Sequence, residues 1–463
     1  MKINKSLSMA LVLVLSITSI LAQKKKKQKS NYILFTNVNI FDGTSETLSN
    51  GMSVLIENNM INKVSQNIKA PRGAKVIDGQ GMTLMPGLID CHTHLMINGK
   101  GLSDIENNQT WEDLALRGGA MAELYLSEGF TTVRDMGGAN GGLNRAIAEG
   151  NIDGPRVYPS AAFIGGRGGH ADFGNYSSKP GQETQMQRLN MTSEVAGPND
   201  VIMVARNNFR QGATQLKIMQ TGGVASLFDP WQLDGMMVAE IKAAVEIANS
   251  YQSYVGAHSY AKKSMMLALD LGVKTLEHGF MFDEEVNNKM IEKGAYITTN
   301  MTAFSPLLAD IPALNDPRNQ HKLQTATAAF KNYIPNVKKL KPKRGHQTDC
   351  VGGPDACQKQ IAYEKHLGAE FFGNYETLKA MTSTAGEIVA LSGPVVNPWP
   401  NGKLGVIEEG AYADILIVKG NPLKDINVIG ANKEWFKAPK RDGVETIKII
   451  MKDGVIYKNT LGK

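Results

Sequence analysis

Cysteine is scarce in this sequence, and its scarcity limits the kinds of fold that the chain can adopt. Only three cysteines occur among 463 residues, which excludes a small scaffold built from disulfides. A chain of this length instead buries a sizeable apolar core. Cys350 and Cys357 flank a loop that they could close as a disulfide in an exported protein, whereas Cys91 fits a small buried filler.

Long apolar runs are also scarce. The run from Met9 to Leu21 is too short for a comfortable membrane span. Lys2 and Lys5 precede it and Ala22 offers a small residue for cleavage, so residues 1–22 are predicted to be a signal peptide. We therefore expect a protein exported to the periplasm or secreted, with no stable membrane span after cleavage.

The formal net charge of +6 has local sources. Lys24 to Lys27 and Lys29 form one basic run within residues 23–31, which predicts a solvated leader rather than a nucleic-acid patch. A second run extends from Lys338 to Arg344. A solvated helix face is the favoured interpretation of this run, and attraction of anionic substrates is the alternative. No nucleic-acid partner is expected.

Alternating apolar and polar residues indicate half-buried strands near both ends of the chain. Neither group can bury a face alone, so residues 32–84 and 397–463 are predicted to pack into one small β-sandwich. The strands expected in it are Tyr32 to Ile40, Ser53 to Ile61, Gly402 to Ile407, Ala413 to Val418 and Ile447 to Met451.

Between these ends, strand and helix patterns alternate over residues 85–396. This order is typical of βα units and predicts an α/β fold with a (β/α)8 barrel, or TIM barrel. The eighth strand has the weakest pattern, because basic residues rather than an apolar run precede it. Expected helices are Trp111 to Glu128, Ala239 to Asn249, Ala261 to Leu271 and Glu376 to Leu391. Expected strands are Leu84 to Asp90, Thr131 to Asp135, Arg156 to Ile164, Thr214 to Met219, Tyr254 to Ala257, Val273 to Glu277, Ala295 to Asn300 and His346 to Asp349.

Four histidines lie at the ends of three of these strands. His92 and His94 close the first strand, and residues two apart on a strand point to the same face, so their imidazoles are expected side by side. His258 and His278 lie at the ends of the fifth and sixth strands. A barrel gathers its chemistry at the carboxyl ends of its strands. One such histidine alone would be a structural residue, but four together predict a metal site.

Lys217 lies in the fourth strand between two apolar residues, where an unpaired ammonium is rarely tolerated. A deprotonated amine at this place can take up carbon dioxide as a carbamate, whose two oxygens can bridge a pair of divalent cations. The alternative is an ion pair with Asp349 or Glu277.

Three further residues are candidates for the chemistry. Asp349, at the end of the eighth strand, can bind a metal and accept the proton of an attacking water, although an N-cap role is the alternative. His170 lies on a glycine-rich loop after the third strand and is a candidate to polarise a carbonyl or hold a substrate oxygen. Tyr260 follows His258 closely and is expected to face the same mouth. Ordinary loop packing is the alternative for both.

Together these motifs resemble the amidohydrolase superfamily, in the branch of imidazolonepropionase-like proteins and metal-dependent Xaa-Pro or Xaa-Arg dipeptidases. The resemblance runs from about Tyr32 to the C-terminus. One departure is Gln347-Thr348-Asp349, where the family has Gly-Thr-Asp after an apolar run. The markers are Met85 to His94, Lys217 to Val224, Ala257 to Tyr260, Glu277 to Gly279 and Ala411 to Leu416.

The resemblance implies a role for each candidate. It implies that His92, His94 and Asp349 hold the more buried metal ion, that His258 and His278 hold the other, and that carbamylated Lys217 bridges the two. In this mechanism a shared water or hydroxide attacks an amide carbonyl, and Asp349 takes its proton and delivers it to the leaving amine. His170 and Tyr260 match the places of substrate-binding residues.

We therefore predict a hydrolase of carbon–nitrogen bonds, not specific for esters, that cleaves a dipeptide or an N-acyl amino acid as a dipeptidase or carboxypeptidase. The order of metal affinities favours Zn²⁺ for both ions. One rival is a mononuclear deaminase or cyclic-imide hydrolase of the same superfamily, which needs no bridging carbamate. The other rival is a non-enzymatic secreted binding protein. Such a protein would be expected to have lost at least one of the metal ligands, and all six are present in this sequence. The sequence leaves open which side chains the substrate carries, which type of bond is cleaved and which metal is bound. It also leaves open the oligomeric state, which could be a homo-oligomer.

Overall fold

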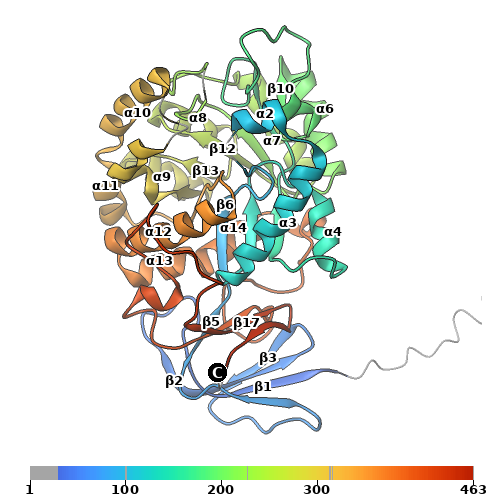
Figure 1. Ribbon diagram of the computed structural model, residues 1–463, viewed down its shortest axis with the longest axis vertical. Helices are drawn as coiled ribbons and strands as arrows, with labels where there is room; N and C mark the ends of the chain where they lie inside the picture. Colours follow the sequence, from blue (N-terminus) through green and yellow to red (C-terminus); the bar gives the residue numbers. More distant parts are fainter. Residues whose placement is uncertain (1–29, 100–101, 227, 312–313, 315, 462–463) are drawn as a thin grey trace, which may run out of the picture.

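The computed structural model of the protein describes residues 30–99, 102–226, 228–311, 314 and 316–461. The predicted signal peptide and most of the predicted basic leader lie outside the described residues. Figure 1 shows a barrel surrounded by helices, with a mixed β-sheet beneath it. Strands from the start of the chain and strands from its end lie together in that sheet. These two parts confirm the predicted fold class.

The mixed sheet is an eight-stranded β-sandwich sheet with the strand order β18-β17-β16-β5-β1-β2-β3, and β4 pairs with β1. Strand β5 joins its two halves, because it runs parallel to β1 and antiparallel to β16. Its core is made of alternating apolar residues such as Phe35, Val38, Ile415 and Ile417. The strands are β1 (Tyr32–Ile40), β2 (Ser49–Glu57), β3 (Met60–Ser65), β4 (Lys75–Asp78), β5 (Thr83–Pro86), β16 (Ile415–Val418), β17 (Ile447–Lys452) and β18 (Val455–Asn459).

Two strand predictions in this sheet were wrong. The stretch from Ser53 to Ile61 is not one strand, because β2 and β3 form a hairpin whose turn contains Asn58 with a φ of 57°. The stretch from Gly402 to Ile407 forms no strand. Gly405 has a φ of 76°, and a Cβ there would lie 2.2 Å from the Thr382 carbonyl oxygen. This segment packs against the helical region instead of pairing with a strand.

The barrel strands are all parallel and form two ladders. Strands β6, β7 and β8 form the first; β9 and β11 to β15 form the second, with β10 at its edge. Strand β15 lies against β6, which brings the two ladders together. The strands are β6 (Leu88–Thr93), β7 (Phe130–Asp135), β8 (Arg156–Pro159), β9 (Phe163–Gly166), β10 (Thr192–Val195), β11 (Leu216–Met219), β12 (Val255–Ser259), β13 (Thr275–His278), β14 (Tyr296–Thr299) and β15 (Arg344–His346).

The structure corrects three of the predicted barrel strands. The first begins at Leu88 rather than Leu84, because the chain leaves the mixed sheet at Gly87, where a Cβ would lie 2.0 Å from the Thr131 side chain. The third is broken into β8 and β9 around Ala161, whose φ is 57°. The eighth ends at His346, so the residues that follow it, including Asp349, lie in a loop. Strand β10 had no counterpart in the prediction.

Helices fill the intervals between the strands and surround the barrel (Figure 1). Three of the predicted helices are confirmed as α3 (Trp111–Ser127), α7 (Val238–Ser250) and α8 (Lys262–Asp270). The predicted helix from Glu376 to Leu391 is two helices, because the chain turns at Thr382, whose hydroxyl bonds back to the Leu378 carbonyl. Among the described residues, no helix combines the length and apolar character that crossing a bilayer requires.

The helices are α2 (Leu102–Asn108), α3 (Trp111–Ser127), α4 (Gly141–Ala148), α5 (Gln185–Arg188), α6 (Pro198–Arg210), α7 (Val238–Ser250), α8 (Lys262–Asp270), α9 (Glu284–Lys293), α10 (Pro317–Phe330), α11 (Tyr333–Leu340), α12 (Pro354–Phe372), α13 (Asn374–Ala380), α14 (Ser383–Ala390) and α15 (Gly393–Val396). Short 3₁₀ helices are η1 (Met301–Phe304), η2 (Pro306–Asp310) and η4 (Ile426–Ile429).

Candidate active site

A cavity of about 230 Å³ lies at the carboxyl ends of the barrel strands. These ends point away from the mixed sheet. Strand β6 begins one residue after β5 of that sheet, so its amino end lies near the sheet and its carboxyl end lies far from it (Figure 1). The structure brings every side chain predicted for the site to this one cavity. They are His92, His94, His170, Lys217, His258, Tyr260, His278 and Asp349.

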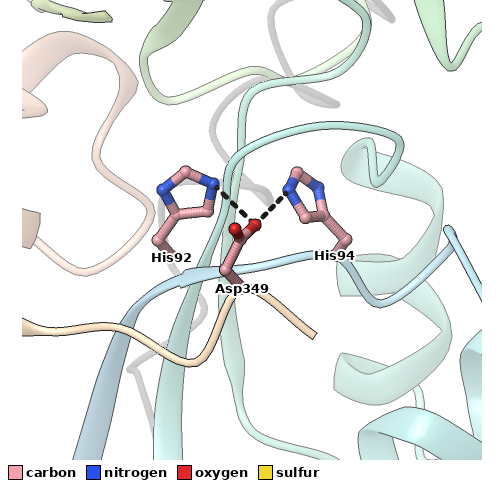
Figure 2. A group of neighbouring side chains, drawn as sticks. All are labelled: His92, His94 and Asp349. Carbon is pink, nitrogen blue, oxygen red and sulfur yellow. Dashed lines mark ion pairs between the residues drawn. The ribbon is translucent and has the colours of Figure 1, made fainter. Parts of the chain in front are cut away.

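Three of these side chains form a compact group of metal-ligand type. Figure 2 shows the imidazoles of His92 and His94 on either side of the Asp349 carboxylate. The Nε2 atoms of His92 and His94 lie 3.5 Å and 3.3 Å from Asp349 Oδ1. One ligand atom from each residue falls within 4.8 Å of the others. This spacing allows all three to bind a single ion.

The hydrogen bonds of the two histidines show that the group suits a cation. Nδ1 of His92 lies 2.9 Å from Glu277 Oε2, and Nδ1 of His94 lies 3.1 Å from the Gly137 carbonyl oxygen. If each Nδ1 carries the proton that these acceptors require, each Nε2 presents a lone pair to the Asp349 carboxylate. Lone pairs facing one another at such distances repel, and a divalent cation between them removes the repulsion.

His258 and His278 form a second pair beside this group. Their ring centroids are 4.6 Å apart, and the ring of His278 lies 5.2 Å from that of His92. His258 Nε2 lies 3.2 Å from the Gly222 carbonyl, which leaves its Nδ1 lone pair free for a ligand role. Burial lowers the pKa of His278 to about 4 and that of His258 well below its usual value. Both imidazoles are therefore neutral, the form that binds metals.

Lys217 is fully enclosed at the base of the cavity, with 1% of its surface exposed. Its Nζ lies 3.3 Å from His92 Nε2, and no ion pair joins it to a carboxylate among the residues that the structure describes. No oxygen of Asp349 or Glu277 lies within 4 Å of this Nζ, but both carboxylates attract it and raise its pKa, so an ion pair with one of them stays an alternative. Burial lowers the pKa of Lys217 to about 8, so a larger fraction of its amine is neutral at neutral pH than for an exposed lysine.

Asp349 is held in a left-handed backbone conformation, with a φ of 53°. His278 is also left-handed, with a φ of 72°, and such strain at non-glycine residues tends to cluster at functional sites. Burial alone would raise the pKa of Asp349, but at the low pH at which this carboxylate takes up a proton, the imidazoles of His92, His94 and His278 are protonated and hold its pKa below the usual range. The N-cap alternative is wrong, because α12 begins after Gly353.

His170 and Tyr260 line the same cavity. Both rings contact the ring of His258. The centroid of the His170 ring lies 4.3 Å from that of His258, and the centroid of the Tyr260 ring lies 4.7 Å from it. His170 Nδ1 is 2.7 Å from Ser226 Oγ and 3.2 Å from Asp229 Oδ2. Burial raises the pKa of the Tyr260 phenol, which therefore remains a hydrogen-bond donor. Their roles toward a substrate stay predictions.

The sequence reasoning missed the buried support of the site. Glu277 orients His92 and forms an ion pair with Arg134, at 2.8 Å, in the barrel interior. Asp90 accepts hydrogen bonds from the His92 backbone N–H, at 3.0 Å, and from Thr348 Oγ1, at 2.5 Å. The available signal was the presence of charged residues within otherwise apolar strands, where only a specific partner makes them tolerable.

The loop after Asp349 is closed by a disulfide between Cys350 and Cys357, whose Cα atoms are 5.7 Å apart. Cys91 is a free and buried cysteine. Both findings agree with the uses expected for these residues. The disulfide restricts the chain immediately after the Asp349 carboxylate, at one wall of the cavity.

Comparison with known proteins identifies the family of this chain. The model of the Amidohydrolase family matches residues 83–343, more than half of the sequence. The chain belongs to the amidohydrolase family. An ochratoxinase of Aspergillus niger is 29% identical over 394 residues, which cover 81% of this chain and 75% of the ochratoxinase.

Two solved amidohydrolase-like structures extend the comparison over almost the whole chain. A prolidase in complex with N-methylphosphonate-L-proline is 30% identical with a TM-score of 0.81, and covers 93% of this chain and 100% of its own. A Xaa-Pro dipeptidase with bound methionine is 25% identical with a TM-score of 0.76, and covers the same shares. The protein is thus a metal-dependent amidohydrolase, and its His92, His94 and Asp349 group suits a divalent ion.

Proposed function

We propose that this amidohydrolase holds two divalent metal ions, favouring Zn²⁺, and hydrolyses the amide bond of a dipeptide or an N-acyl amino acid. The observation that carries the proposal is the convergence of six ligand-type side chains on one cavity. His92, His94 and Asp349 would hold one ion, and His258 and His278 the other. Neighbours that include a prolidase and a Xaa-Pro dipeptidase support a peptide-type substrate.

A carbamate on Lys217 would complete the proposed pair of ions. A carbamate forms only from the neutral amine, and the buried position of Lys217 favours that form. Among the described residues no carboxylate oxygen lies within 4 Å of its Nζ, and the close polar contact of the amine is His92 Nε2, at 3.3 Å. The lysine then changes from a cation that would repel metal ions into an anion that attracts them.

The metal ions would polarise the substrate carbonyl and make the attacking water more acidic. The protein residues have their own tasks. Asp349 exposes 25% of its side chain to the cavity and stays ionised, so it can accept a proton from water and pass it to the leaving amine. His170 and Tyr260, as hydrogen-bonding groups on the same wall, would hold the substrate oxygens.

The cavity wall supports an apolar substrate. Besides Lys217, no lysine or arginine lines the cavity among the described residues, and Asp349 is the one carboxylate there. An Xaa-Arg dipeptide would therefore place its guanidinium among apolar groups, at a high desolvation cost. We propose substrates with apolar or aromatic side groups. The apolar lining includes Phe163, Phe173, Phe280, Phe330, Leu308, Ile311 and Trp435.

Metal content and amide hydrolysis should be measured on the same preparation. We expect about two divalent ions per chain and metal-dependent cleavage of Xaa-Pro or N-acyl amino acids in preference to Xaa-Arg dipeptides. A single ion without amide cleavage would favour the mononuclear deaminase or cyclic-imide hydrolase instead. Absence of any bound metal would revive the binding-protein interpretation.

Two variants test the ligand assignment. His92→Ala and Lys217→Ala should each reduce turnover to background, because each change removes a proposed metal ligand. The fold should stay largely intact, because the backbone hydrogen bonds between the strands are kept. Lys440→Ala, at an exposed position, is the matched control. Native mass spectrometry should detect the added mass of one carbon dioxide in the wild-type protein and its loss in Lys217→Ala. Full activity in both variants would contradict the proposed metal centre.

We further propose that the protein is exported, to the periplasm or the medium. The disulfide between Cys350 and Cys357 supports an oxidising compartment. The N-terminus of the mature protein should begin near Gln23 when the chain is recovered from an exported fraction. A full-length chain that retains Met1 and stays in the cytoplasm would contradict the proposal.

A further inference from the structure

A second cavity, of about 350 Å³, lies at the opposite end of the barrel from the candidate active site. Arg344 lines this cavity and is the first residue of β15, so the cavity lies at the amino end of that strand. The candidate active site lies at the carboxyl ends of the strands. We call it the basal cavity. It is lined by Val337, Lys338, Lys341, Pro342, Lys343, Arg344, Phe371, Phe372, Glu376, Lys379, Ala380, Thr384 and Glu387.

Arg344 is the unusual member of this lining. Only 8% of its surface is exposed, and its guanidinium carbon lies 4.4 Å from the centre of the Phe372 ring. Within the described part of the chain its guanidinium makes no hydrogen bond and has no carboxylate oxygen within 4 Å, and Glu364 and Glu376 attract it from farther away. Buried arginines normally have several partners, because an uncompensated charge in a protein interior is costly. The guanidinium therefore offers its N–H groups to the basal cavity.

The other charges of the basal cavity leave an excess of positive charge. Lys343 is neutralised by Glu387, with 2.7 Å between Nζ and the carboxylate. Lys338, Lys341 and Lys379 have no carboxylate partner among the described residues. In that part of the chain, Glu376 is the one lining carboxylate with no cation within 4 Å, and it attracts Arg344 from farther away. Four cations, Arg344 included, thus face one carboxylate.

We propose that the basal cavity binds a small oxyanion of the phosphate or carboxylate class. Stacking on Phe372 fixes the plane of the Arg344 guanidinium, and a fixed guanidinium fork matches two oxygens of such an anion. Lys341 and Lys379 line the same cavity and add positive charge to it on flexible side chains. The anion is not the substrate, since this cavity lies away from the candidate metal ligands.

The test is a titration of the metal-loaded protein with inorganic phosphate, and separately with acetate, at constant ionic strength. Isothermal titration calorimetry should show saturable binding of at least one of them, and the preferred anion identifies the class. Arg344→Gln should weaken that binding by about tenfold or more, because a charge-assisted bidentate contact is lost. Glu376→Gln should strengthen it by removing the opposing carboxylate.

Two further variants keep the test decisive if Arg344→Gln fails to fold. Lys379→Gln should weaken binding, whereas Lys424→Gln, a charge-matched change at an exposed position elsewhere, should not. Saturable binding that responds to these changes supports the proposal. Absence of saturable binding for both anions overturns it. Binding that His92→Ala abolishes and that Arg344→Gln and Glu376→Gln leave unchanged also overturns it, because such an anion would sit on the active-site metals.

Discussion

At the scale of single residues, the site depends on a carboxylate that never touches the cavity. Glu277 is fully buried, and the Arg134 guanidinium and His92 hold its pKa well below the usual value, against the raising effect of burial. It accepts two hydrogen bonds from Arg134, at 2.9 Å and 2.8 Å, and orients His92 through Nδ1. The position of one metal ligand is therefore set by an ion pair in the barrel interior.

Replacing Glu277 by Gln should weaken metal binding by about 10- to 100-fold, the usual effect of removing a partner of a metal-bound histidine. It should also cost about 3–5 kcal/mol of unfolding free energy, because the Arg134 charge is left buried and unpaired. Chelator competition and denaturant unfolding measure the two effects. Glu445→Gln, at an exposed position, is the control. Unchanged metal affinity in Glu277→Gln would remove the orienting role.

Sequence reasoning reached the cavity residues but not this support. Histidines at strand ends and a lysine within an apolar strand carry a local signal, since each residue type conflicts with its surroundings. Glu277 carries the same signal, but its partner Arg134 lies far away in sequence, and a single sequence does not reveal such a pairing. The same limit hid the hydrogen bond from Thr348 to Asp90.

At the scale of elements, periodicity located strands better than it located their ends. The βα alternation predicted the barrel, but the break between β8 and β9 depends on the left-handed residue Ala161, and no apolar pattern marks the end of β15 at His346. Gly87 shows the same limit, because Thr131 leaves no room for a side chain there. Element ends are set by such tertiary contacts.

The contact between α12 and η1 provides a prediction at this scale. Glu364 of α12 accepts hydrogen bonds from the backbone N–H groups of Met301 and Thr302, at the start of the segment beyond β14. Burial raises its pKa from 4.5 to about 8. A raised pKa in the folded state means that stability falls as the pH rises from 4.5 to about 8, by up to about 1.4 kcal/mol per pH unit.

In Glu364→Gln this loss should be smaller, because the amide does not ionise. Denaturant unfolding of both proteins across that pH range measures the difference in slope. Glu434→Gln, at an exposed position, should keep the wild-type slope. Equal slopes for the wild type and Glu364→Gln would show that Glu364 is already ionised in the folded protein at low pH.

At the scale of the whole molecule, one arginine joins the barrel to the mixed sheet. Arg156 of β8 contacts Asp414 with two hydrogen bonds, at 2.9 Å and 3.1 Å, and reaches Asp453 at 2.7 Å. Its guanidinium also lies over the rings of Trp399 and Tyr412. Because Arg156 and Asp414 are buried, the loss of one partner leaves an uncompensated charge between the two parts.

Asp414→Asn should therefore cost about 3–5 kcal/mol of unfolding free energy. Asp453→Asn is the matched control, and it should cost less than about 1 kcal/mol because 43% of its side chain is exposed. Thermal and denaturant unfolding measure both. Similar losses for the two variants would argue against Asp414 as the principal partner of Arg156.

The pairing of β5 with β16 has a consequence for how the protein is made. Thr83 of β5 lies opposite Val418 of β16. The first half of the mixed sheet therefore pairs with strands that are synthesised more than 300 residues later. Until then β5 presents an open edge, which other chains can join. A nascent chain of this protein cannot complete its fold during synthesis. We expect it to need protection by chaperones until its last strands emerge.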